Sequence, residues 1–111
     1  MAEEVVLCGA NAYEQKYYFN ELFNKVPDSI KDELHIICVL FTEEVGGVIL
    51  FKFDEEGDIL ITTDAEEDDI YYDEIASGLL VKKIRSTKQE LLESLSLFYK
   101  IVILGQKIDL E

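Results

Sequence analysis

The chain has 111 residues, of which 49% are apolar and 11% aromatic, and its formal charge is −14 at pH 7. This length suits a single domain spanning residues 1–111, and the apolar content excludes a disordered acidic chain. Carboxylates in such excess repel phosphate backbones and anionic bilayers, so we expect neither nucleic acid nor a membrane as partner.

The first half of the chain predicts a short strand followed by two helices. An apolar run at 4–8 favours a strand or an ordered arm. Apolar residues recur with helical spacing over 11–25 until Pro27 interrupts the pattern, which predicts a helix ending there. The same spacing over 30–45, closed by the two glycines at 46–47, predicts a second helix.

The next segment predicts a β-hairpin and a third helix. The β-rich runs 48–53 and 58–64 are joined by a short acidic turn with a glycine, which is a hairpin pattern. Asp68 and Asp69 can cap a third helix. Its glycine at position 78 weakens it, so residues 79–84 are either its continuation or a third strand.

A last helix is predicted from the capping box at 87–90 to the glycine at 105. The predicted fold class is therefore α+β: a single domain with an antiparallel β-hairpin, or a three-stranded sheet, packed against about four helices.

The charge is concentrated in one segment. Between Asp54 and Glu74 there are eleven acidic residues and no lysine or arginine. Tyrosines are also numerous, and tyrosine favours interfaces because it buries area while keeping a hydroxyl group for hydrogen bonding. The candidate interaction residues are Tyr13, Tyr17, Tyr71, Asp68 and Asp69. These features favour a protein partner, or a second copy of the chain in a homodimer, as the ligand.

Residues with reactive side chains give a weaker, alternative hypothesis. Cys8 and Asn11 lie at a predicted turn, and His35 with Cys38 has the i, i+3 spacing of two metal ligands. A structural zinc site needs four such ligands, and a nucleophilic cysteine needs a base beside it. We therefore predict no catalytic residue, no metal site and no cofactor. A small-molecule or metal-responsive sensor or enzyme with a site near Cys8 and Asn11 remains the alternative.

The N-terminal residues lack the basic and apolar regions of a secretory signal. A cytoplasmic location is expected on that ground, with both cysteines reduced.

Three segments carry a family resemblance: Val6–Asn20, Cys38–Gly47 and Leu91–Tyr99. Together they resemble a family of short acidic bacterial proteins, found mainly in Gram-positive anaerobes and classed as a domain of unknown function. The resemblance covers nearly the whole chain and implies no activity, cofactor or catalytic residue.

Overall fold

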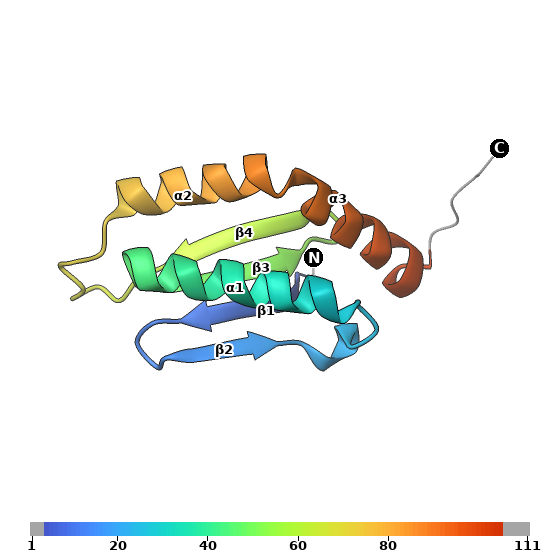
Figure 1. Cartoon of the computed structure of the whole chain (residues 1–111), viewed down its shortest axis with the longest axis horizontal. Coiled ribbons are helices and arrows are strands. Elements are labelled where there is room, and N and C mark those ends of the chain that lie inside the picture. The colour runs from blue at the N-terminus through green and yellow to red at the C-terminus, as the bar shows by residue number, and fades with distance from the viewer. Residues whose placement is uncertain (1–3, 106–111) are drawn as a thin grey trace.

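A computed structural model describes residues 4–105 as a four-stranded antiparallel sheet with helices on one face (Figure 1). The α+β class is confirmed, with four strands where two or three were predicted, and three α-helices where about four were predicted. The elements are β1 (Val5–Asn11), β2 (Lys16–Phe19), the 3-10 turn η1 (Glu21–Phe23), α1 (Asp28–Val45), β3 (Val48–Phe53), β4 (Ile59–Asp64), α2 (Glu74–Thr87), α3 (Gln89–Phe98) and the π-helical turn η2 (Tyr99–Ile103).

The predicted helix over 11–25 is wrong, because β1 and β2 form a hairpin there. The Asn11 side chain accepts hydrogen bonds from the backbone N–H groups of Tyr13 (2.9 Å) and Glu14 (3.2 Å), which reverses the chain. Gln15 completes the reversal with a φ of 54°. Strand β2 then runs to Phe19 and pairs with β1. The aromatic residues Phe19 and Phe23 have helical spacing because β2 ends at Phe19 and the chain then turns into η1, where Phe23 is buried.

Helix α1 is confirmed and begins and ends where predicted to within two residues. Pro27 precedes its first turn, and Gly46, with a φ of 78°, follows its last residue. One face of α1 is buried against the sheet through Leu34, Cys38 and Phe41.

The predicted β3–β4 hairpin is also confirmed, and the strand order in the sheet is β2-β1-β3-β4. Because side chains alternate across a strand, Phe51 and Phe53 point to the same face as α1 and are fully buried. Phe53 stacks on Tyr99 of η2 with ring centroids 4.3 Å apart, so the last turn of the chain closes the core.

Helix α2 begins later than predicted. Asp73, not Asp68 or Asp69, caps it by accepting a 3.0 Å hydrogen bond from the N–H of Ala76. Residues 79–84 are helical, so the alternative of a third strand there is wrong. The capping box predicted at 87–90 does not form, because α2 continues through Thr87 and α3 follows almost without a break.

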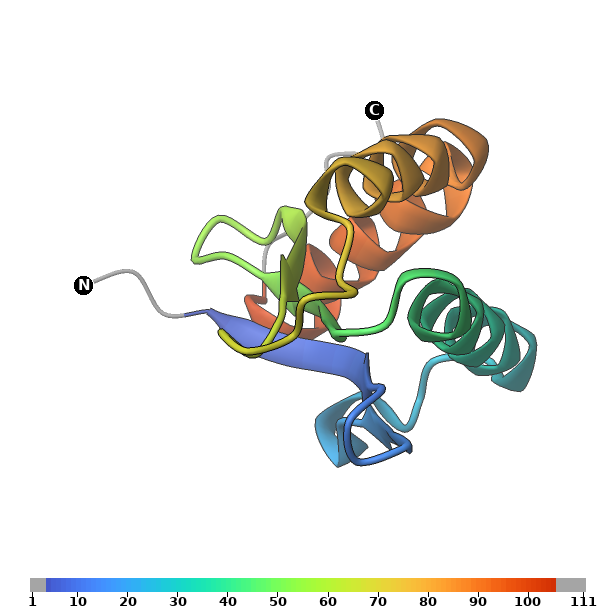
Figure 2. The ribbon, with the colours of Figure 1, turned by 90° about the vertical axis from the view of Figure 1, so that its left-hand side faces the viewer.

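The helices within residues 4–105 all lie on one side of the sheet, and none of them covers the other face (Figure 2). Within residues 4–105, every helix is too short or too polar to span a bilayer. The arrangement places the β1–β2 turn and the β4–α2 connection at the same end of the sheet, where most of the predicted interaction residues lie.

Candidate functional site

The connection from β4 to α2, residues 64–74, carries most of the clustered acidic side chains, and we call it the acidic loop. It is folded by short-range hydrogen bonds. The N–H of Ala65 donates to the Asp64 carboxylate (2.9 Å), and the N–H of Tyr71 donates to Asp69 Oδ1 (3.1 Å). A backbone bond from Asp69 N–H to the Glu66 carbonyl (3.0 Å) closes a turn between them. The loop therefore has a defined local structure.

Tyr13 anchors this loop to the β1–β2 turn. Its hydroxyl donates to Asp69 Oδ2 at 2.6 Å and accepts from the N–H of Glu66 at 3.0 Å. The hydrogen bond to the Asp69 carboxylate raises the pKa of Tyr13, because it stabilises the protonated phenol. Two of the predicted interaction residues, Tyr13 and Asp69, are thus brought together and hold one another in place.

Tyr72 forms a second anchor, at the start of α2. Its hydroxyl donates to the Ser77 hydroxyl at 2.7 Å, and Ser77 is only 2% exposed. The Tyr72 ring lies against the backbone of Gly47, where a β-carbon would come within 2.6 Å of the ring. Neither Tyr72 nor Ser77 was singled out by sequence analysis, since nothing local marks a contact of this kind.

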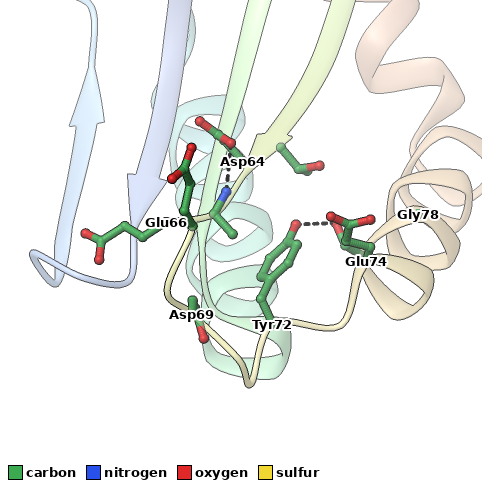
Figure 3. A pocket seen from close by; sticks show the side chains of 10 residues that line it. Asp64, Glu66, Asp69, Tyr72, Glu74 and Gly78 are labelled. Atoms are coloured by element: carbon green, nitrogen blue, oxygen red, sulfur yellow. Dashed lines mark hydrogen bonds between the residues drawn. The ribbon is translucent and has the colours of Figure 1, made fainter.

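Between the anchors lies an open hollow of about 500 Å³, shown in Figure 3. Its lining includes Asp64, Glu66, Glu67, Asp69 and Glu74. Among the described residues, no three potential ligands come close enough together to hold a metal ion. The hollow is a negatively charged surface lined by five carboxylates.

Large apolar side chains stand exposed beside these carboxylates. Ile70 is 84% exposed, Tyr71 89%, Ile75 77% and Leu79 63%, and we call these four residues the apolar strip. Tyr71 and Asp68, both predicted as interaction residues, lie exposed in the acidic loop next to Ile70. Exposed apolar groups gathered within one segment are typical of interaction surfaces.

Tyr17 lies elsewhere, on β2, where its side chain faces α1. Its ring stacks on the exposed ring of His35 with centroids 4.3 Å apart. Its hydroxyl is buried beside the thiol of Cys8, without a partner in good hydrogen-bonding geometry among residues 4–105. Burial, followed by the nearby thiols of Cys8 and Cys38, raises the pKa of Tyr17. Tyr17 is therefore a packing residue, separate from the acidic loop.

The site considered near Cys8 and Asn11 does not assemble as a reactive centre. Asn11, Tyr17 and His35 line a hollow of about 520 Å³, but Cys8 does not line it and is fully buried behind Tyr17. Both cysteines are free. A hydrogen bond with Cys8 and burial raise the pKa of the Cys38 thiol, the opposite of what a nucleophile needs.

Comparison with known proteins gives a family and no function. The model of a family of unknown function, DUF6145, matches residues 4–107. Searches of curated proteins and of solved structures found no match.

Proposed function

We propose that this chain, which belongs to the DUF6145 family of unknown function, is a protein-interaction module that acts by binding and not by catalysis. Its ligand is a basic partner protein, and the contact surface is the acidic loop with the apolar strip. We place the interaction in the bacterial cytoplasm, a setting that suits two free buried thiols.

The observation that carries this proposal is the exposure of Tyr71 on an anchored loop. The Tyr71 side chain is 89% exposed, although the loop is held by hydrogen bonds from Tyr13 on one side and Tyr72 on the other. Holding apolar groups in water costs free energy, and a binding partner that covers them recovers it. An anchored loop also loses less conformational entropy on binding than a flexible one.

The charge of the loop supports a basic partner. The ion pairs within residues 4–105 join Lys31 to Asp28, Lys52 to Glu4, Lys88 to Glu33 and Lys100 to Asp58. None of these pairs involves the acidic loop, so its carboxylates remain unneutralised. Their field attracts cationic surfaces and accelerates association with them.

The test is a quantitative pull-down from native lysate with the immobilised protein. We expect a basic protein to be retained at about 50 mM salt and largely lost at about 300 mM, because the shorter Debye length screens the attraction. Tyr71→Ser should reduce its recovery. Tyr18→Ser is the matched control, since Tyr18 is also exposed (53%) but lies on β2 and faces away from the helices.

Two results would contradict the proposal. If salt leaves the recovery of the basic protein unchanged, electrostatic attraction to the acidic loop does not drive the binding. Equal recovery by the Tyr71→Ser and Tyr18→Ser variants would show that the apolar strip is not the contact surface.

A further inference from the structure

The apolar strip continues into a groove between α1 and α2. The two helices lie side by side and run in opposite directions (Figure 1), and a hollow of about 380 Å³ opens between them. Its apolar lining consists of the partly buried Val45, Ala76 and Leu80 and the exposed Leu79 and Tyr71. We call this hollow, with its extension along α1, the interhelical groove.

A stripe of side chains on α1 runs between two hollows that both border α2. Glu44 lines the first hollow, and Glu33, which accepts a 2.7 Å hydrogen bond from Lys88, lines the second. Leu40 lies four residues before Glu44 and seven after Glu33, so it belongs to the same stripe of α1, and it is 57% exposed. The eleven residue steps from Glu33 to Glu44 span roughly 16 Å at the α-helical rise, which is about three turns.

Charge decides what can occupy the groove. Glu44 and Asp73 stand at the end that meets the acidic loop, and within residues 4–105 neither is in an ion pair, while Lys83 on α2 is the single base that lines the hollow. A second copy of this chain would bring a charge of −14 against a charge of −14, which opposes association. A ligand with lysine or arginine at that end is favoured instead.

We infer that the interhelical groove binds an amphipathic helix of the basic partner. Its apolar face would cover Leu40 and Leu79, and its basic residues would meet Glu44 and Asp73. A helix of about three to four turns matches the length of the stripe on α1, and two adjacent helices can accept a third by packing ridges into grooves. The inference rests on the proposed function and names the structural class of the ligand.

The experiment uses two synthetic amphipathic peptides as probes. Both have sixteen residues (a length of roughly four helical turns) and the same leucine face, and they differ only in carrying lysine or glutamate on the polar face. Fluorescence anisotropy measures their binding to the full chain, and peptide-induced changes in amide NMR shifts locate it. We expect the lysine peptide to bind, with shifts along α1 and α2, and the glutamate peptide not to bind.

Matched variants test the groove directly. Leu40→Ser and Leu79→Ser change exposed side chains, so the fold should tolerate them, and each should weaken binding of the lysine peptide roughly tenfold. Leu97→Ser is the control, since Leu97 is an exposed leucine (48%) on α3 outside the groove.

The possible failures can be told apart. Suppose Leu40→Ser and Leu79→Ser bind normally while Asp68→Asn with Glu67→Gln weakens binding: the acidic loop then binds the basic ligand and the groove inference is wrong. No binding of the lysine peptide overturns the groove inference alone if the pull-down still retains a basic protein, and both proposals if it does not. A dimer in sedimentation that Leu79→Ser dissociates would assign the groove to a second copy and also overturn the inference.

Discussion

The hydrogen bond between Tyr72 and Ser77 should stabilise the fold by a measurable coupling energy. Tyr72→Phe removes the donor and leaves the Ser77 hydroxyl, 2% exposed, without this partner. Stranding a buried polar group costs about 1–3 kcal/mol. We expect a loss of about 1–2 kcal/mol, since a serine hydroxyl can rotate toward a helix carbonyl. Ser77→Ala should cost less, about 0.5–1 kcal/mol, because the half-buried Tyr72 hydroxyl can reach water.

A double-mutant cycle separates the hydrogen bond from these side effects. The Tyr72→Phe, Ser77→Ala double variant should be more stable than the sum of the single losses predicts, by about 0.5–1.5 kcal/mol. Urea unfolding followed by far-UV circular dichroism gives the free energies of unfolding of the unsubstituted protein and the three variants. If the loss of stability in the double variant equals the sum of the two single losses to within about 0.3 kcal/mol, the hydrogen bond is refuted as an anchor of the acidic loop.

Three further predictions follow from the backbone and the buried thiols. Gly47→Ala should lower the melting temperature, because φ at position 47 is 70° and a β-carbon there would lie 2.6 Å from the Asp64 carbonyl oxygen. Gly78→Ala, in open space on α2, should instead stabilise by about 0.5–1 kcal/mol, and a melting temperature lowered equally by both would contradict the argument. At neutral pH an aromatic disulfide reagent should label the native protein far more slowly than the protein in urea, because Cys8 and Cys38 are fully buried. Labelling of the native protein at the rate of a free thiol would be the contrary result. Finally, stability should fall above about pH 9 by up to roughly 1.4 kcal/mol per pH unit. The unfolded chain releases the Cys38 proton near its ordinary pKa of 9.0, and the folded chain, whose Cys38 pKa is raised, retains it. Urea midpoints that do not change between about pH 8 and pH 10 would refute this linkage.

The sequence predicts α1 well because two independent signals agree there. The apolar residues of 30–45 recur every three or four positions, and Pro27 and Gly46 bound the same segment. The β3–β4 hairpin was predicted for a similar reason, since Gly57, with a φ of 91°, lies between two β-rich runs. Where periodicity and turn residues predict the same element, the local sequence is enough to assign that element.

The segment 11–25 misled the prediction because its spacing fits two structures. Phe19 and Phe23 are four residues apart, which suits one face of a helix. It also suits a strand that ends at Phe19 and a turn that buries Phe23. Strand β2 is only four residues long, too short for alternation to be distinguished from helical periodicity. Pairing with β1, a tertiary contact, decides the outcome.

The candidate site could be predicted only in part for the same reason. Tyr13 and Asp69 were each chosen from the sequence, but their hydrogen bond joins residues 56 positions apart. The contact between Tyr72 and the backbone of Gly47 likewise depends on how α1, β4 and α2 meet. Tyr17 has the same residue type and a neighbouring position, yet lies behind His35 because β2 points it at α1. Which tyrosine packs inside and which lies at the surface is thus decided by the sheet.

The acidity and the apolar strip are best understood together. Side chains as exposed as Ile70, Tyr71 and Ile75 would promote self-association in a neutral protein. Here they lie within or next to a loop of unneutralised carboxylates, so two copies that approach through this surface bring like charges together and repel each other. A basic partner of the kind we propose would meet no such repulsion, and the same carboxylates would accelerate its approach. In that proposal the charge acts on specificity, since it disfavours a second copy of the chain and favours a cationic ligand, while the apolar groups supply the contact area.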